Sequence, residues 1–189
     1  MTPADFLKSL SGPAAFAGAP FGADLIVFCE ALQKRGGIGV YVARDDRLAQ
    51  AARRMALFAA PRLEQVDLPG WDVLPYDRIS PTPAVAARRC AGLARLARYD
   101  AGQGPLLVVT TAGSLVQRAA PLSTLKKTSF ALRKGQSVKQ AELTEYLAVN
   151  GYIRAGTVRE QGEFAIRGGI IDIFPPTARE PFRLDFFGD

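Results

Sequence analysis

Apolar positions recur with two different periods over the first 120 residues of the chain. Three segments carry apolar side chains at helical spacing: residues 24–35, 47–59 and 84–99. Three shorter segments have strand character: residues 38–43, 63–69 and 105–111. The first and last of these are typical of parallel strands that are buried on both faces. Strands that alternate with helices predict βαβ crossovers, so we expect a parallel sheet covered by helices.

Residues that favour helix ends and loops separate these segments. Asp24 is placed to cap the start of the first helix, and the Gly36-Gly37 pair stops it. Asp45 and Asp46 open the second helix, where the helix dipole stabilises acidic side chains. The following segment, residues 70–83, is rich in proline and predicts an irregular loop.

The pattern changes after about residue 120. Residues 125–138 alternate like a strand and carry several Lys and Arg side chains, and residues 140–152 predict a short helix. Alternating apolar residues then predict antiparallel strands within 158–176 and 181–187. The predicted fold class is therefore α/β, with a parallel-sheet domain over 1–120 and a smaller α+β module with antiparallel strands over 121–189.

Composition narrows the possible chemistry. The chain has no histidine, which removes imidazole-based acid–base catalysis, Ser-His and Cys-His nucleophiles, and imidazole metal ligands. The two cysteines, Cys29 and Cys90, lie far apart in helical patterns and predict buried thiols in a reducing compartment. A net charge of +6 permits an acidic partner or nucleic acid without requiring either.

Targeting signals give a consistent expectation. The opening residues lack a basic stretch followed by an apolar run, so we expect no signal peptide. No apolar run is long enough to cross a bilayer, so we expect no membrane partner and a cytoplasmic protein.

The glycine-rich segment Gly12–Leu25 precedes the first helix and invites comparison with a phosphate-binding loop. Such a loop needs a lysine for the phosphates and a hydroxyl for Mg²⁺, but here Ala23 and Asp24 follow Gly22. An acid at a helix start repels phosphate. We also find no metal-ligand spacing around Asp72 and Asp77. The sequence predicts no catalytic residue, no bound cofactor and no metal site.

Two segments carry a family resemblance. Trp71 begins a W-x-x-L-P-Y-D…S-P…R…L…L pattern, and Gly162 begins G-E-F-x-x-R-G-G-I-x-D-x-F-P-P, followed by R-x-D-F-F-G-D from Arg183. Both patterns resemble the bacterial transcription-repair coupling factors (Mfd), and in looser form the excinuclease component UvrB. The likeness covers nearly all of the chain.

The resemblance implies a fold and a role. Residues 1–120 would be a degenerate UvrB-like domain with a RecA-like sheet that has lost its ATPase loop. Residues 121–189 would bind the excinuclease component UvrA and recruit it to stalled transcription sites in nucleotide excision repair. The chain ends in the middle of the second pattern, so the resemblance implies an N-terminal fragment that is not itself an enzyme. The ATP- and Mg-dependent DNA translocase, and the contacts with RNA polymerase and double-stranded DNA, would belong to downstream regions.

The resemblance also implies site residues. Arg154 and Arg167 match arginines with which UvrB holds UvrA, whereas Ala165 stands where a third such arginine is expected. An arginine on a rigid strand binds a carboxylate strongly. The alternative is that Arg167 only pairs with Asp172 or Asp185 within its own sheet.

Four further residues are predicted partner contacts: Phe164, Asp172, Phe174 and Phe187. The two aromatic residues Phe164 and Phe174 are also candidates for the core, because phenylalanine in an alternating strand is more often buried. Phe187 falls on the polar side of the alternation in the last strand.

A second functional hypothesis is a UvrB-like DNA-binding domain. The helical segment 84–99 would present a basic face to phosphates, and Tyr76 would contact bases. The basic residues of this face are Arg88, Arg89, Arg95 and Arg98. The alternative is that the basic residues form a solvated helix face. Trp71 is expected to be a structural residue that fills the underside of the parallel-sheet domain.

Overall fold

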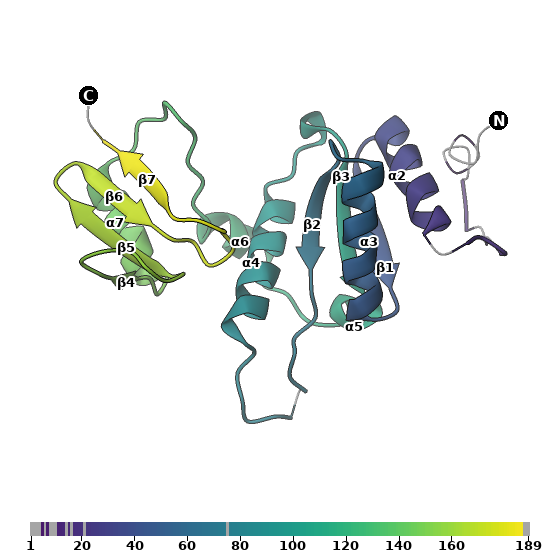
Figure 1. Cartoon of the computed structure of the whole chain (residues 1–189), viewed down its shortest axis with the longest axis horizontal. Helices are drawn as coiled ribbons and strands as arrows, with labels where there is room; N and C mark the ends of the chain where they lie inside the picture. The colour runs from purple at the N-terminus through teal and green to yellow at the C-terminus, as the bar shows by residue number, and fades with distance from the viewer. Residues whose placement is uncertain are drawn as a thin grey trace. The chain divides into compact units, whose positions relative to one another are not determined.

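The computed structural model of this chain describes residues 5, 7, 11–13, 15, 17–20, 22–74 and 76–186. The chain divides into two compact units, which we call the first unit, residues 1–126, and the second unit, residues 127–189. The division falls at the end of helix α6, Leu122–Lys127, whereas the sequence suggested a boundary near residue 120. A mixed α/β architecture is confirmed (Figure 1).

The first unit is built on a three-stranded parallel sheet. Its strands are β1 (Ile38–Ala43), β2 (Glu64–Leu68) and β3 (Leu106–Thr111), in the order β1-β3-β2. Both neighbouring pairs are parallel, with Val40 and Val66 each in register with Val108. Every residue of β3 is buried, as its continuous apolar sequence predicts.

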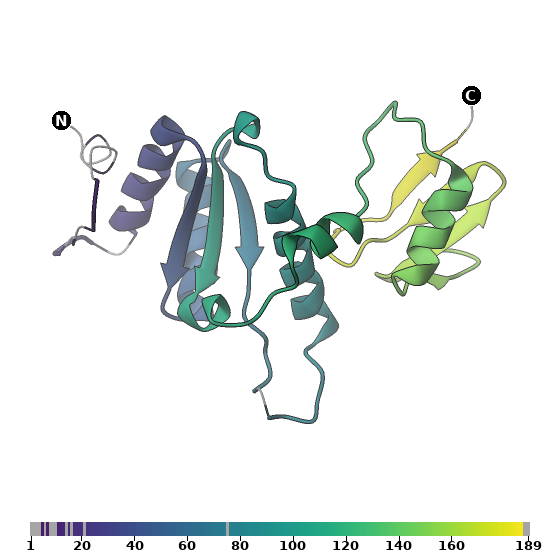
Figure 2. The same ribbon diagram turned by 180° about the vertical axis from the view of Figure 1, so that it is seen from behind.

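Helices cover both faces of this sheet (Figures 1 and 2). The principal helices are α2 (Ala23–Arg35), α3 (Asp46–Ala59) and α4 (Pro83–Ala97). Helices α2 and α3 pack on the face that carries Leu107 and Val109, and α4 packs on the face that carries Leu106 and Val108. Two short helices, η1 (Ala101–Gln103) and α5 (Ala112–Leu115), flank β3.

Helix starts in the first unit partly match the prediction. The Asp45 carboxylate caps α3 by accepting a 2.9 Å hydrogen bond from the Leu48 amide. The expected Asp24 cap is wrong, because the residue that precedes α2 is Gly22, whose φ of 86° lies in the left-handed region. Asp24 instead accepts a 2.8 Å hydrogen bond from the Tyr41 hydroxyl. A cap must precede the helix, and Asp24 already lies in the first turn.

Strand β1 differs from its predicted burial. Ile38, Val40 and Val42 are 44–46% exposed on the face of β1 that shares its side with Val108. Helix α4 packs on β2 and β3 at this face but leaves β1 uncovered. The apolar run correctly predicts a parallel strand, but its position at the sheet edge leaves one side open.

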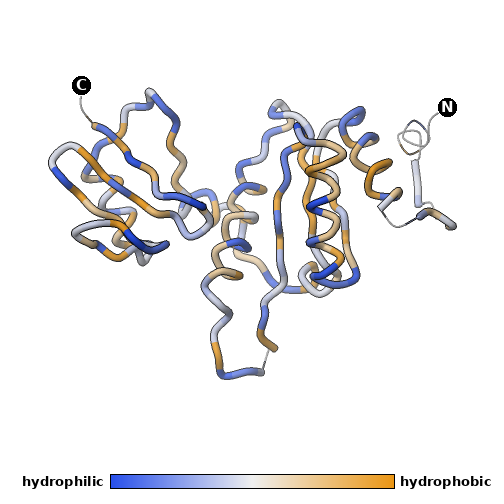
Figure 3. The backbone as a smooth tube through the Cα atoms, viewed as in Figure 1, coloured by the Kyte–Doolittle hydropathy of each residue, from blue (hydrophilic) through white to orange (hydrophobic). Residues whose placement is uncertain are grey.

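The loop between β2 and α4 has an exposed tip. Leu74, Tyr76 and Ile79 are 70%, 97% and 67% exposed, and apolar and polar residues alternate along this loop (Figure 3). Its base is closed by Asp72, which accepts hydrogen bonds from the Thr82 amide at 3.1 Å and the Thr82 hydroxyl at 2.6 Å. Among the residues that the structure describes, no helix is long and apolar enough to span a bilayer.

The second unit combines one helix with a four-stranded sheet. The strands lie in the order β4-β5-β6-β7, in which β4 runs parallel to β5 and the other pairs are antiparallel. Their bounds are β4 Ile153–Arg154, β5 Glu163–Arg167, β6 Ile170–Ile173 and β7 Phe182–Asp185. Helix α7 (Gln140–Val149) lies across one face (Figure 2), and Leu143, Leu147, Phe164, Ile171 and Ile173 form the core between them.

The β5–β6 hairpin follows the sequence closely. Arg167 pairs with Ile170, so Gly168 and Gly169 form a two-residue turn. Gly168 has a φ of 59°, which the first central residue of a type II′ hairpin turn requires and which glycine adopts without strain.

The predicted strand at 125–138 is wrong. This segment contains the end of α6 and then an irregular stretch that pairs with no strand among the described residues. Phe130 packs against Tyr146 with ring centroids 5.0 Å apart, and the Tyr146 hydroxyl donates to the Thr128 carbonyl at 3.0 Å. The alternating apolar residues therefore pack on α7 individually instead of forming a sheet ladder.

Candidate protein-interaction site

The candidate site lies on the sheet of the second unit. Side chains alternate between the two faces of a strand, and Phe164, Ile171 and Ile173 point into the core beneath α7. The intervening residues therefore lie on the opposite side, which we call the outer face. The outer face carries Ala165 and Arg167 of β5, Ile170 and Asp172 of β6, and Arg183 and Asp185 of β7.

Arg167 is exposed on the outer face and is held by neutral groups. Its Nη2 atom donates to the Gly156 carbonyl at 2.8 Å and to the Thr157 hydroxyl at 2.7 Å. Its Nε and Nη1 atoms donate to no residue that the structure describes, and no described carboxylate forms an ion pair with it. The expected alternative, in which Arg167 pairs with Asp172 or Asp185, is therefore not found.

Asp172 is bound instead by Arg183, which the sequence analysis missed. Arg183 Nε lies 2.7 Å from Oδ1 and Arg183 Nη2 lies 2.9 Å from Oδ2 of Asp172, so the pair is bidentate. These hydrogen bonds lower the pKa of Asp172 and raise the pKa of Arg183. The sequence placed Arg183 on the polar side of its strand, but only the register between β6 and β7 brings it opposite Asp172.

Arg154 is also exposed, but strand register separates it from Arg167. Its guanidinium makes no hydrogen bond or ion pair with the described residues. Arg154 pairs with Phe164 across the parallel β4–β5 ladder, and such partners point to the same side of a sheet. The two arginines thus lie on opposite faces, both in the β4–β5 part of the sheet, and a partner must reach around the β4 edge to contact both.

The predicted aromatic contacts differ from one another. Phe164 is only 2% exposed and packs in the core, so its expected partner contact is corrected to a structural role. Ala165 is 1% exposed, so the position of the missing arginine is covered in this chain. Phe174 is partly buried and continues the ladder beyond β6, because its amide donates to the Glu163 carbonyl at 2.9 Å. Phe187 lies outside the described residues.

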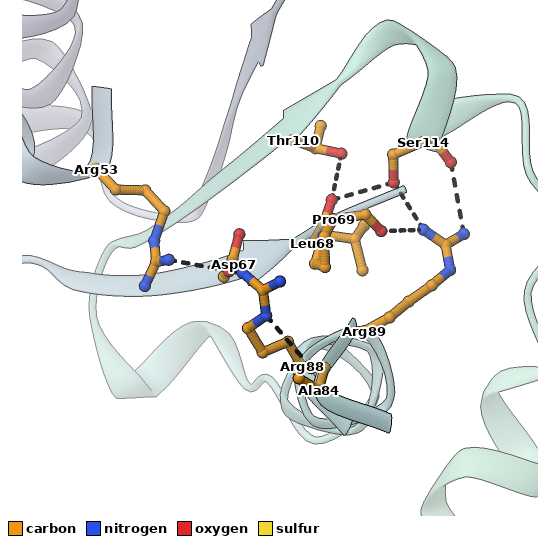
Figure 4. A network of polar contacts seen from close by, with 9 residues as sticks. All are labelled: Arg53, Asp67, Leu68, Pro69, Ala84, Arg88, Arg89, Thr110 and Ser114. Atoms are coloured by element: carbon orange, nitrogen blue, oxygen red, sulfur yellow. Dashed lines mark hydrogen bonds and ion pairs between the residues drawn. The ribbon is translucent and has the colours of Figure 1, made fainter. Parts of the chain in front are cut away.

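Arginines expected on a basic face of α4 make contacts within the first unit, and Figure 4 shows those of Arg88 and Arg89. Arg89 is 2% exposed and donates from Nη1 to the Pro69 carbonyl and the Ser114 hydroxyl, both at 2.7 Å. It also lies over the Trp71 ring, 5.2 Å from the centroid, and burial lowers the pKa of Arg89. Its assignment to the basic face is therefore wrong.

The other arginines of α4 are largely paired within the first unit. Arg88 and Arg53 both bind Asp67, at 3.4 Å and 2.9 Å. Arg95 binds both carboxylate oxygens of Glu64, at 2.5 Å and 2.6 Å. These contacts weaken the case for a phosphate-binding stripe, because acids of the same chain already compensate the charges.

A hollow of about 390 Å³ lies at the start of α2, where the sequence suggested a degenerate phosphate loop. Its lining includes Gly22, Asp24, Tyr41, Arg44 and Met55, and no lysine among the described residues. Burial and the hydrogen bond to Asp24 raise the pKa of Tyr41 to about 12. The Met55 side chain lies directly against Gly22. The absence of nucleotide binding stays a prediction.

The remaining candidate chemistry is sparse. Within the described ranges, no three His, Cys, Asp or Glu side chains cluster as a metal site would require. Cys29 is buried, and burial raises the pKa of its thiol, as expected for a structural cysteine. Cys90 is exposed, which corrects the prediction that both thiols are buried.

Comparisons with known proteins give a match over the second unit. A family model described as the UvrB interaction domain matches residues 130–189, and this range holds α7 and the whole four-stranded sheet. The second unit is therefore similar to the UvrB interaction domain over nearly all of its length.

Individual relatives match a longer part of the chain than the family model does. The chain is 32% identical over 169 residues to the transcription-repair-coupling factor of Haemophilus influenzae, covering 89% of this chain and 14% of that protein. It is 40% identical over 125 residues to the factor of Mycobacterium tuberculosis and 34% identical over 124 residues to that of Escherichia coli. Those matches cover 65% and 66% of this chain and 10% of each relative. The chain belongs to the transcription-repair-coupling factor family and spans a small part of these relatives' length.

Proposed function

We propose that the second unit binds the excinuclease component UvrA and thereby recruits it to stalled transcription complexes in nucleotide excision repair. The observation that carries this proposal is Arg167, an exposed guanidinium on a rigid strand with no acidic partner in the described chain. A partner that supplies a carboxylate would compensate this cation, and an arginine at such an interface contributes strongly to affinity.

The surroundings of Arg167 support a recognition role. The Gly156 and Thr157 contacts fix the guanidinium, so little side-chain entropy is lost when a partner binds. Arg154 adds a second exposed cation near the same sheet edge. An acidic segment that wraps around the β4 edge would contact both.

We assign no catalytic role and no cofactor to these 189 residues. The proposal leaves ATP-driven movement on DNA, and contacts with RNA polymerase and double-stranded DNA, to parts of the related factors that this chain does not match.

The test is titration calorimetry of the chain with purified UvrA. Arg167→Glu should weaken binding by about 2–4 kcal/mol, which is about 30-fold to 700-fold in Kd. Arg154→Glu should also weaken binding, while Arg179→Glu, at an arginine with no described contact, should change it little. Equal effects of Arg167→Glu and Arg179→Glu would contradict the proposal.

A parallel experiment addresses DNA. The chain is mixed with damaged duplex at moderate salt, with and without UvrA. Retention by DNA alone, unchanged by Arg154→Glu and Arg167→Glu, would favour the DNA-binding hypothesis instead.

A further inference from the structure

Asp172 lies between two arginines on the outer face. It is directly opposite Arg183 in the β6–β7 ladder, and it is diagonal to Arg167, which pairs with Ile170. Diagonal neighbours of an antiparallel pair are about 7–8 Å apart, a spacing that long side chains bridge. Either arginine can therefore reach the same carboxylate.

Arg183 binds both oxygens of the Asp172 carboxylate. Its two nitrogens bind one oxygen each, at 2.7 Å and 2.9 Å, while Arg167 turns toward Gly156 and Thr157 on the β4 side. The positive charge of Arg167 also helps to lower the pKa of Asp172, so the two groups sense each other without an ion pair. Without Arg183, Asp172 would be an acid of this face available to Arg167.

We propose that Arg183 is a positioning residue that occupies Asp172 and so keeps Arg167 uncompensated for an acidic protein partner. This inference rests on the proposed function, because it concerns the same recognition surface. Arg183 acts through Asp172 and not by contacting the partner, which distinguishes it from Arg154 and Arg167.

The binding test compares Arg183→Met, Asp172→Asn/Arg183→Met and the control Arg179→Met in titrations with UvrA. Arg183→Met should weaken binding by up to about fivefold, the value of an exposed ion pair that Arg167 would now form with Asp172. The double variant should restore binding, because Asp172 can no longer hold Arg167. Failure of the double variant to restore binding, or no change in Arg183→Met relative to Arg179→Met, would overturn the inference.

A second measurement does not need the partner. Carbon-detected NMR titration of the Asp172 carboxyl should give a pKa that stays below the ordinary aspartate range in Arg183→Met and rises in Arg167→Met/Arg183→Met. Equal pKa values in these two variants would show that Arg167 does not replace Arg183, and would overturn the inference even if UvrA binds. If the titration behaves as expected but even the unmodified chain does not bind UvrA, the proposed function fails. The inference that Arg167 replaces Arg183 at Asp172 when Arg183 is removed then still stands.

Discussion

Arg89 of the first unit and Arg167 of the second unit illustrate two opposite uses of arginine. In the first unit, Arg89 is buried between α4, Pro69 and Ser114, and Arg95 is paired with Glu64. In the second unit, Arg154 and Arg167 are exposed, and no described carboxylate pairs with either. The net positive charge of the chain therefore includes arginines with two different roles. Some stabilise the fold, and others are available to a partner.

The difference shows how an arginine's role follows from its neighbours. A buried guanidinium must find partners for its donors within the chain, and the two Nη atoms of Arg89 do so with two carbonyls and a hydroxyl. The Arg89 Nε is buried and has no hydrogen-bond partner among the described residues. An exposed guanidinium is solvated, so its remaining donors carry no penalty and can be exchanged for a partner's oxygens. Substitution of a buried arginine should lower the stability of the fold, whereas substitution of an exposed arginine should weaken binding to a partner.

The largest expected effect on stability comes from Arg89→Met. It removes the hydrogen bonds to Pro69 and Ser114 and leaves buried oxygens without donors, so the free energy of unfolding should fall by about 2–4 kcal/mol. Arg167→Met should change it by less than about 0.5 kcal/mol, because that side chain is exposed. Urea unfolding followed by circular dichroism measures both, and similar losses would break the comparison.

Gly92 allows α4 to lie close enough to β2 for Arg89 to be buried. A Cβ atom at this position would lie 2.5 Å from the Asp67 carbonyl oxygen and 3.2 Å from Val66 Cγ1. Gly92→Ala should therefore cost about 1–3 kcal/mol of stability despite the better helix propensity of alanine. Gly113→Ala in α5 has no atom within 4 Å and serves as the control, with no loss expected.

The Arg95–Glu64 pair should have a smaller effect. Glu64→Gln should lower the free energy of unfolding by about 0.2–1 kcal/mol, since the pair is partly exposed and screened by solvent. The loss should shrink in salt of about 1 M, where the Debye length is about 3 Å. Glu180→Gln, at an exposed acid with no described contact, should show neither the loss nor the salt dependence.

The smallest expected effect is the pH dependence of the stability that the Arg95–Glu64 pair contributes. The hydrogen bond from Arg95 lowers the pKa of Glu64, so the folded state favours the ionised form. The stabilisation is present above the ordinary glutamate pKa of about 4.3 and is lost as pH falls through the folded-state value. Thermal melts of the unmodified chain and Glu64→Gln should differ at about pH 7 and converge once the pH has fallen below the folded-state pKa of Glu64. A constant difference would contradict the ion-pair explanation.

Local patterns predicted most of the fold. The continuous apolar run of β3, the amphipathic pattern of α4 and the glycine turn between β5 and β6 each specify their own structure. These features depend on residues close together in sequence, so they can be inferred without knowledge of the tertiary structure. The family motifs likewise indicated the transcription-repair-coupling factor family, to which the comparisons assign the chain.

The errors came from contacts between distant segments. Burial of Arg89 depends on Ser114, and the capture of Asp172 by Arg183 depends on strand register. The exposed side of β1 depends on which part of the sheet α4 covers. Alternation alone could not show that Phe130 packs on α7 instead of entering a strand. In the candidate site, the family resemblance singled out Arg154 and Arg167 but not Arg183, which occupies Asp172.

Trp71 is the single tryptophan of the chain, and it lies in the first unit beneath the guanidinium of Arg89. Its fluorescence is consequently an intrinsic reporter of one unit only. A melt followed at the indole wavelength, set beside one followed by backbone ellipticity, would reveal whether the first and second units lose their structure together or in separate steps.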